Sequence, residues 1–470
     1  MERRPQAGWS LARRPAQALA LALGGALLTF TAPAHRPDLL AIGLVALAAA
    51  MVWQPALSPG LVAAAVPLYF FPRQIAGPLS FSPPGLLLVV AWLGVLANRL
   101  APRWRGRTRT AAPRWPRTPY DAPIAVFLVA ALLSMLVTEY PLLSVRELRA
   151  LILEPVLFFW LLAVLKDEGA VRTALTGFLT GAAVVGGVAI AQVGFGFGGT
   201  AAEGVRRAQA WYPSPNHLAL LMGRALPYFA AFALGPGSGR GPGATRPPGA
   251  WLGLAVVAVA LLLTFSTGGW LGAAVALVAV LVALGRRQAA LRLGGVAAAG
   301  LLAVSLLSLA GVLPERLNPL RQTGGFRVEL WSSTLEMIRD HPLLGVGLDN
   351  FVYLYQQVYL HEGAAAEPNL SHPHNWLLHL WVQLGLAGLL AFLWLVGRFG
   401  AEARRALRRP GSRCLVAGAV GALADMLAHG LVDNSYFLVD LAFIFWLTLA
   451  AGSGAPAAEP SEPVGTLGAT

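Results

Sequence analysis

The sequence of 470 residues has little charge and a single cysteine. Only 12% of its residues are Asp, Glu, Lys or Arg, about half the share of a typical soluble protein, whereas 56% are hydrophobic. Cys414 has no second cysteine to pair with, so an intramolecular disulfide is excluded. This composition excludes a soluble globular domain and is typical of a chain that lies largely within a membrane.

Apolar runs close to the length that crosses a bilayer recur along the whole chain. We predict an all-α polytopic membrane protein with roughly 12–14 transmembrane helices and one large external loop that bears short amphipathic helices. Transmembrane helices would occupy 1–312, followed by the large loop at 313–373, further helices in 374–452 and a tail at 453–470. The predicted apolar segments are 15–32, 38–53, 57–72, 84–98, 121–138, 148–165, 172–193, 217–234, 250–265, 269–285, 293–312, 374–397, 414–432 and 436–452.

The formal net charge of +13 comes from arginines in short loops, so it indicates membrane topology rather than binding to nucleic acid. With the N-terminus in the cytoplasm, the arginine-rich loop 99–117 and the C-terminal tail also fall on the cytoplasmic side. The loop 194–216 and the large loop then lie outside. They carry Arg206, Arg207 and Arg327, which break the positive-inside rule, and binding of an anion is the natural reason.

The large loop contains two predicted interfacial helices. In 327–338 the apolar residues Val328, Trp331, Leu335 and Ile338 share one helical stripe, so we expect that face to lie on the bundle. The stretch NFVYLYQQVY would form the second helix, with its aromatic side chains at the level of the lipid headgroups.

The stretch NLSHPHNWLLHLWVQLGLAGLLAFLW places histidines at the start of a membrane-spanning run. Pro373 fits the first turn of a helix, which would make Ser371 or His372 its cap. His374 and Asn375 would then lie beside free backbone N–H groups, which form an anion site where an imidazole can exchange protons near neutral pH. Capping of a helix at the headgroup boundary, without further function, is the alternative.

A metal site is another interpretation of these histidines. His372 and His374 could face one way in an extended segment and share an ion, with further ligands from His361, Glu362 or Glu367. The proline between the two histidines and the lack of a defined ligand spacing weigh against it.

Asp425, His429 and Asp433 repeat at intervals of four on one face of a late helix. Such a stripe could be a proton path through a transporter. A buried structural stripe, or a polar one at the outer mouth, is the interpretation we favour.

The stretch HPHNWLLHLWVQLGLAG resembles the signature of the O-antigen ligase and Wzy-type polymerase superfamily. That signature is a histidine followed by Asn, Ser or Gln, nine residues, Gly, two residues and a small residue or Tyr, and His374, Asn375, Gly385 and Gly388 satisfy it. Upstream, RVELWSSTLEMIRDHPLLGVGLDNF is similar to the family's Arg…Trp…His-Pro…Gly-x-Gly…Asn-Phe stretch, and RRAQAWYPSPNHLALLMGRALP to its arginine and Pro-Asn motif. The resemblance covers about 206–390.

The resemblance implies a GT-C-like membrane glycosyltransferase that acts on a glycan carried by undecaprenyl pyrophosphate at the outer leaflet of the inner membrane. It implies that His374 activates the acceptor hydroxyl and that arginines, Arg327 among them, hold the pyrophosphate, without a metal or another cofactor. The family's second arginine lies in a Ser-Arg motif, and here TFSTGGWLG has Thr267 in its place. The candidates to supply the missing charge are Arg206, Arg207 and Arg224.

We therefore predict a multi-pass glycosyltransferase of the cytoplasmic membrane, with its site on the external, periplasmic side and both termini in the cytoplasm. The acceptor would be a lipid, protein or other envelope molecule for a ligase, and another glycan repeat for a polymerase. The alternative is a secondary transporter or flippase of envelope precursors, although no internal repeat is visible. The predicted catalytic residues are His374 and Arg327, and the predicted pyrophosphate ligands are Arg206, Arg207, Arg327 and Asn375.

Overall fold

The computed structural model describes residues 10–33, 35–76, 79–104, 116–166, 169–202, 205–235, 249–312, 326–365, 368–409 and 411–454. Within these residues the chain is almost entirely helical and adds two short β-hairpins, so the predicted all-α class is confirmed. The start of the large loop (313–325), most of the loop 99–117 and the tail after residue 454 lie outside the described residues.

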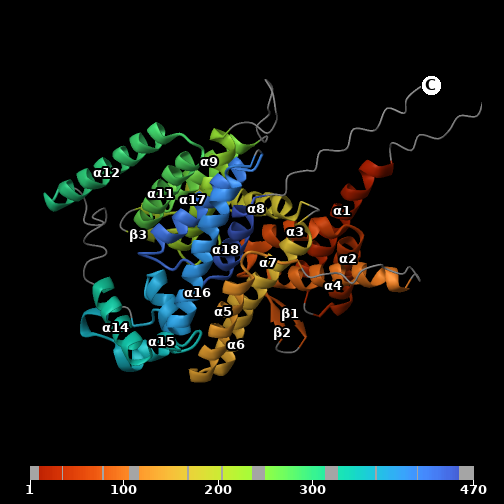
Figure 1. Ribbon diagram of the computed structural model, residues 1–470, viewed down its shortest axis with the longest axis horizontal. Helices are drawn as coiled ribbons and strands as arrows, with labels where there is room; N and C mark the ends of the chain where they lie inside the picture. The colour runs from red at the N-terminus through yellow and green to blue at the C-terminus, as the bar shows by residue number, and fades with distance from the viewer. Residues whose placement is uncertain are drawn as a thin grey trace, which may run out of the picture.

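Every predicted apolar segment corresponds to a helix of the structure (Figure 1). The helices of the first half are α1 (Ser10–Thr31), α2 (Pro37–Trp53), α3 (Ser58–Ala65), α4 (Pro83–Trp104), α5 (Asp121–Ser134), α6 (Pro141–Glu147), α7 (Glu154–Val164), α8 (Ala170–Phe195) and α9 (Pro215–Leu234). Those of the second half are α10 (Ala250–Leu263), α11 (Thr267–Ala283), α12 (Arg287–Leu309), α14 (Phe326–Asp340), α15 (Phe351–Leu354), α16 (Trp376–Ala406), α17 (Arg413–His429) and α18 (Val439–Gly452). Short 3-10 or π turns complete them: η2 (Pro55–Leu57), η3 (Val66–Leu68), η4 (Met135–Val137), η5 (Leu148–Leu153), η8 (Tyr355–Tyr359) and η9 (Glu362–Ala364).

The described residues contain helices that can cross a membrane. By length and composition, α8, α9, α12 and α16 are each long and apolar enough to do so, and six shorter helices are also apolar. The segment after α2 runs from Pro55 to Leu68 and meets α2 at 110°, as expected where a proline removes a helical hydrogen bond. The run predicted at 57–72 is therefore part of a bent pair, which makes at most a fifth crossing.

The two hairpins lie in segments that join helices. Strands β1 (Arg73–Ala76) and β2 (Leu79–Phe81) are antiparallel, and so are β3 (Thr200–Ala202) and β4 (Val205–Arg207). The second hairpin lies in the predicted external loop 194–216 and sets the direction of the two arginines at its end.

A compact group of helices supports the candidate site: α17 packs against both α9 and α11 (Figure 1). Glycines of α17 permit the close contact, because a Cβ at Gly418 or Gly421 would lie 2.5 Å from Tyr228 Cδ1 or Pro227 Cβ of α9. Small residues at helix contacts are usual in membranes, where tight packing replaces the hydrophobic effect between helices.

Helix α16 is broken at Gly385, whose backbone has φ 68° and ψ −176°. The loop after α14 fits into this break: Val346 N–H donates to the Val382 carbonyl (2.7 Å), and Leu386 N–H donates to the Pro342 carbonyl (3.1 Å). The loop thus pairs backbone groups that the break leaves open, as a buried segment requires. The segment 326–365, called the outer segment below after its predicted external position, is thereby attached to the helix that follows the histidine motif.

The outer segment is also fastened to the start of α6. Asn350 is fully buried, and its carboxamide oxygen accepts the backbone N–H groups of Glu139 (3.0 Å) and Tyr140 (3.2 Å). Its amide nitrogen donates to the hydroxyls of Thr138 (2.7 Å) and Ser144 (2.9 Å). A side chain with every polar atom paired in this way fixes the position of the loop.

The predicted helix at 327–338 is present as α14, but only part of its predicted buried face is buried. Val328 and Leu335 are 49% and 52% exposed, whereas Ile338 of the predicted stripe is buried. The other buried positions are Leu330, Ser333, Thr334 and Met337. The reason is that α14 packs against three neighbours, η8, η9 and α16. These contacts, rather than the apolar stripe alone, decide which side chains of α14 are buried. Three aromatic residues of the second predicted helix, Phe351, Tyr355 and Tyr359, are buried in the same core as α14.

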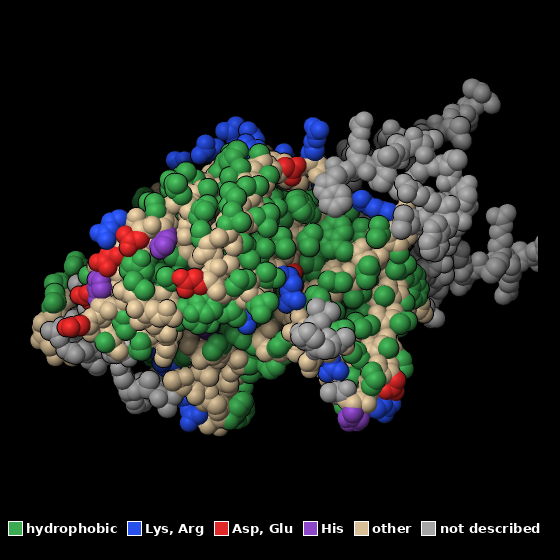
Figure 2. All heavy atoms as spheres, turned by 90° about the horizontal axis from the view of Figure 1, so that it is seen from below, with side chains coloured by type: hydrophobic (Ala, Val, Ile, Leu, Met, Phe, Trp, Pro, Cys, Tyr) green, Lys and Arg blue, Asp and Glu red, His purple; other side chains and the backbone are tan. Residues whose placement is uncertain are grey.

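The surface of the bundle is apolar over large areas. Figure 2 shows hydrophobic side chains over much of one face, with many of the charged side chains near its margins and a few within it. Leu27, Val45, Leu93 and Leu302 are each more than half exposed, on α1, α2, α4 and α12. Exposed aliphatic side chains on apolar helices are the expected surface of a protein surrounded by lipid.

Candidate active site

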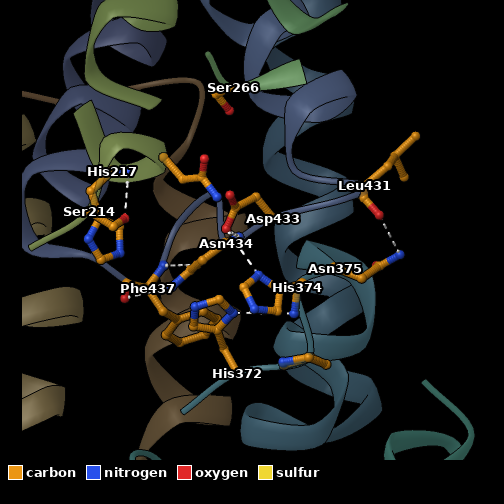
Figure 3. Close-up of polar contacts among 12 residues, drawn as sticks. Ser214, His217, Ser266, His372, His374, Asn375, Leu431, Asp433, Asn434 and Phe437 are labelled. Atoms are coloured by element: carbon orange, nitrogen blue, oxygen red, sulfur yellow. Dashed lines mark hydrogen bonds and ion pairs between the residues drawn. The ribbon is translucent and has the colours of Figure 1, made fainter. Parts of the chain in front are cut away.

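Three helices begin around one region at the same end of the bundle. Ser214, Ser266 and Asn375 are the N-caps of α9, α11 and α16, and each side chain accepts a backbone N–H from the first turn of its own helix. Figure 3 shows these caps around His217 and His374. The positive ends of three helix dipoles therefore face one region, which favours a negatively charged ligand.

His374 lies immediately before α16 and contacts an aspartate of the turn between α17 and α18. Its Nδ1 is 3.2 Å from Asp433 Oδ1, with side chains 19% and 7% exposed. Its backbone has φ 50°, an uncommon value for a residue other than glycine, and its N–H donates to His372 Nδ1 (3.2 Å). The strained backbone and these two contacts fix the direction of the imidazole.

Asp433 is ionised in this setting. Burial would raise the pKa of its carboxyl, but the hydrogen bond from His374 and the nearby charges of His374, His429 and His372 outweigh burial and hold that pKa well below its ordinary value. The backbone N–H of Asn434 also donates to Asp433 Oδ1 (2.8 Å). Because an ionised carboxylate can only accept, His374 Nδ1 carries a proton, and Nε2 offers its lone pair whenever the imidazole is neutral.

The predicted N-cap of α16, His372 or Ser371, is wrong by three or four residues. Asn375 is the N-cap, and its Oδ1 accepts the backbone N–H groups of Leu377 (3.0 Å) and Leu378 (3.3 Å). Its amide nitrogen donates to the Leu431 carbonyl (3.3 Å). Asparagine competes well for this position because its oxygen reaches the first-turn donors, so the helix starts after His374 rather than before it.

The two neighbouring arginines of β4 point to opposite faces of the β3–β4 hairpin, as successive residues of a strand do. Arg207 donates from Nε to the Thr264 carbonyl (2.7 Å) and from Nη2 to Asn216 Oδ1 (3.1 Å). Its guanidinium thus lies at the turn where Thr267 begins α11. Arg206 is exposed and donates to a carbonyl of its own hairpin (2.8 Å). Arg207, rather than Arg206, is directed at the site.

Arg327 comes to the same end of the bundle from the outer segment. It lies in the first turn of α14, and its charge is near enough to His429, the last residue of α17, to act on it. Trp331, one turn further along α14, donates from Nε1 to the Pro373 carbonyl (2.9 Å), directly beside His374. The helix that carries Arg327 is therefore attached to the histidine loop.

The stripe Asp425–His429–Asp433 is not a continuous path. Asp425 is paired with Arg224 inside the bundle, where their side chains are 0% and 3% exposed, and Asp433 is engaged with His374. Both ring nitrogens of His429, between them, are buried without a hydrogen-bond partner among the described residues. The pairing also removes Arg224 from the candidates for the charge missing at Thr267.

The metal site that combined the histidine motif with His361 is wrong. His361 bridges two glutamates of α14: Nδ1 is 3.0 Å from Glu329 Oε2 and Nε2 is 3.2 Å from Glu336 Oε2. These hydrogen bonds raise the pKa of the His361 imidazole. His361 therefore attaches η9 to α14, and Glu367 lies outside the described residues.

Two residues near His374 were not predicted for the site. Asp433 was predicted only as part of the helical stripe with Asp425 and His429. His217 follows the Pro-Asn motif directly, but only the arginine, proline and asparagine of that stretch were considered. His217 acts electrostatically on His372 and is itself influenced by His374 and Asp433. Their separation from the histidine motif along the chain hid this grouping, because a single sequence gives spacing but no contact between distant helices.

Fold and site define a polytopic helical membrane protein with a histidine–aspartate pair and two arginines at one end of its bundle. Residues 252–393 match the family model described as O-Antigen ligase, so the resemblance inferred from the motifs is confirmed over this segment. The segment contains Arg327, His374, Asn375 and Gly385.

A relative supports the same family. Over 90 residues the chain is 29% identical to a protein of Rickettsia conorii whose name describes it, provisionally, as a polysaccharide ligase. The aligned stretch covers 18% of this chain and 22% of that relative.

Proposed function

We propose that the protein is a membrane glycosyltransferase that moves a glycan from undecaprenyl pyrophosphate to an acceptor hydroxyl. The acceptor is an envelope lipid, protein or other molecule if the enzyme is a ligase, or another glycan repeat if it is a polymerase. The match to the O-antigen ligase family over residues 252–393 supports transfer of a glycan. A GT-C-like bundle with its site at the bilayer edge suits a donor whose carrier lies in the membrane while its sugar stands in water.

The contact between His374 and Asp433 is the observation that carries this proposal. The acceptor O–H gives its proton to His374 Nε2, and the acceptor oxygen attacks the anomeric carbon of the donor sugar. The bond from that carbon to the phosphate oxygen breaks, and the pyrophosphate leaves with the electron pair. Asp433 holds Nδ1–H and stabilises the imidazolium that forms, as in hydrolases in which a carboxylate orients the base.

Positive charge at the site stabilises the leaving group. Arg207 approaches from the β3–β4 hairpin and Arg327 from α14, and the N-termini of α9, α11 and α16 face the same region. Preorganised donors of this kind act where negative charge develops on the phosphate oxygens. The proposed role of Asn375 is to fix the start of α16. Its carboxamide oxygen accepts the Leu377 N–H, and its amide nitrogen donates to the Leu431 carbonyl. All these groups belong to the protein, so the proposed reaction needs no metal.

The distribution of charge supports a periplasmic site. α9, α11 and α16 begin at the site, and α17 ends there. The opposite ends of α11, α16 and α17 carry arginines: Arg286, Arg287, Arg404, Arg405 and Arg413. Basic residues at that end favour its placement in the cytoplasm, which puts the site on the external side of the cytoplasmic membrane.

A transporter is disfavoured by the same contacts. A proton path needs titratable groups that pass a proton along, and Asp425 and Asp433 are held by separate partners. The break in α16 at Gly385, a feature that transporters use to bind ions, is filled by the loop after α14.

Transfer from purified lipid-linked donor by the purified protein tests the proposal. His374→Ala should lose about 10²–10⁴ in rate, the usual contribution of a general base. Arg207→Ala should lose about 10²–10³, as when one donor to a developing charge is removed. Arg206→Ala is the matched control in the same strand and should lose far less. Near-normal transfer by His374→Ala would refute the assignment of the base, and equal losses at positions 206 and 207 would refute the assignment of Arg207.

A glycan profile of a deletion strain separates ligase from polymerase. Single repeats without polymer indicate a polymerase, whereas intact polymer retained on the lipid carrier indicates a ligase. EDTA treatment of the purified enzyme should not lower transfer, and a loss restored by Mg²⁺ would contradict metal independence.

A further inference from the structure

The histidine motif and the α17–α18 turn form a cluster of metal-binding groups. His372, His374 and Asp433 each offer one ligand atom, and these three atoms lie within 4.8 Å of one another. One pair of these groups, His374 Nδ1 and Asp433 Oδ1, is 3.2 Å apart. Two ligands of a tetrahedral Zn²⁺, with bonds of about 2.0–2.2 Å, lie about 3.3–3.6 Å apart. This pair is thus already separated like two ligands of one ion.

A further imidazole lies on the first turn of α9. His217 has a buried Nδ1 with no hydrogen-bond partner in the part of the chain that the structure describes. The charges of Asp433 and His374 act on it. Figure 3 shows the His217 side chain in the same region as His372, His374 and Asp433. His217 lies outside the group of three, and as a fourth ligand it would complete the three imidazoles and one carboxylate of a four-coordinate zinc site.

The ligand types select the class of ion. Imidazole nitrogens suit zinc, copper and nickel, whereas magnesium and calcium require oxygen ligands. The side chain of His374 is 19% exposed, so the cluster can be reached from outside the protein. His372 Nδ1 accepts the N–H of His374, and a turn of the His372 ring by half a rotation presents Nε2 to the ion instead.

We propose that His372, His374 and Asp433, joined by His217, bind a divalent transition-metal cation of the zinc class, and that the bound ion inhibits transfer. Binding follows from the cluster alone. Inhibition rests on the proposed function, because an ion held by His374 and Asp433 breaks the pair that activates the acceptor. The site is thus a binding site for an inhibitor, and the reaction itself remains independent of metal.

Direct binding tests the site without reference to activity. The full-length protein, purified in detergent with a tag free of histidine and stripped with EDTA, is titrated with Co²⁺ and Zn²⁺. We expect one ion per chain, with the strong visible absorption of tetrahedral cobalt, and no competition from Mg²⁺. Asp433→Asn and His372→Gln should weaken binding by at least the roughly 10–100-fold that supporting groups of metal sites contribute. His361→Gln, on the outer segment and outside the cluster, is the matched control and should bind as the unmodified protein does.

Three outcomes would overturn the proposal or one of its parts. Absence of a cobalt spectrum, or binding that survives Asp433→Asn and His372→Gln, would refute the site. Stimulation of transfer by Zn²⁺ would refute inhibition while leaving the site in place. Inhibition is measured as the ratio of transfer with and without Zn²⁺ within each variant, and His217→Gln should need at least about tenfold more Zn²⁺ for half inhibition. If the unmodified protein shows no transfer at all, the proposed function fails and the cobalt titration still decides the site.

Discussion

Replacement of Gly385 by alanine should disconnect the outer segment from α16. The backbone at Gly385 has φ 68° and ψ −176°, a conformation that is essentially restricted to glycine. A Cβ there would collide with the Leu343 carbonyl oxygen and lie 2.7 Å from Leu344 Cα. Both contacts are with backbone, so no side-chain rotation relieves them and the loop itself has to move away.

The size of the effect follows from two contributions. A non-glycine residue in this backbone conformation costs about 1–3 kcal/mol. Displacement of the loop loses the hydrogen bonds Val346 N–H to Val382 O and Leu386 N–H to Pro342 O, each worth about 0.5–1.5 kcal/mol. The free energy of unfolding should therefore fall by about 2–6 kcal/mol.

Gly397→Ala is the matched control, because Gly397 lies in the same helix and a Cβ there meets nothing within 4 Å. Alanine is favoured over glycine in a helix by about 1 kcal/mol, so the control should be neutral or stabilising. Thermal unfolding in detergent, followed by tryptophan fluorescence, compares the two variants, and limited proteolysis of the loop 341–347 reports its release. Equal unfolding temperatures for Gly385→Ala and Gly397→Ala would refute the reasoning.

Three further outcomes are expected. Arg224→Met leaves Asp425 buried without its partner and should cost about 3–5 kcal/mol in thermal unfolding, and Asp425→Leu in the same chain should restore much of it; no recovery would contradict a simple ion pair. His361 has a raised pKa, so the stabilisation from its hydrogen bonds to Glu329 and Glu336 of α14 should be fully present below about pH 6.5 and be lost as pH rises through that raised pKa. Hydrogen exchange of 359–365, corrected for its intrinsic rate, should rise in that window. The same pH profile in His361→Ala would contradict this role of His361. Trp331→Phe removes the donor to the Pro373 carbonyl, so it should lower the rate of transfer with little change in the unfolding temperature. A lower unfolding temperature with a nearly normal rate of transfer would instead indicate a purely structural role.

The elements of the fold were predictable because each depends on local hydrophobicity. Every apolar run became a helix, and the extra helix at 327–338 was found from its period. The buried face of α14 was not predictable, since it depends on contacts with η8, η9 and α16. The bend between α2 and α3 has a local cause in Pro55, yet hydropathy alone counted two crossings there.

The candidate site was predictable only where one segment carries it. His374 and the arginines could be chosen by motif and by their departure from the positive-inside rule. Asp433 could not be paired with His374, because fifty-nine positions separate them and only the packing of α16 beside α17 brings them together. The choice between Arg206 and Arg207 depends on the strand that directs them to opposite faces. A hairpin this short has no hydrophobic pattern from which it could be predicted.

The spacing of the histidine motif can now be explained, because α16 links His374 at its start to the loop after α14 at Gly385. Asn375 caps α16 and so fixes where the helix begins, directly after the imidazole of His374. Gly385 follows ten residues later, about 15 Å along the helix at 1.5 Å per residue, and seats the loop that comes from α14. The same α14 carries Arg327 and is tied back to the motif by the bond from Trp331 to Pro373. One helix therefore sets the position of the base at its start and, through its break, the position of the helix that carries an arginine. A residue inserted between Asn375 and Gly385 would rotate the break by about 100° around the helix and move it away from the loop, so such an insertion should abolish transfer even though it changes no residue of the site.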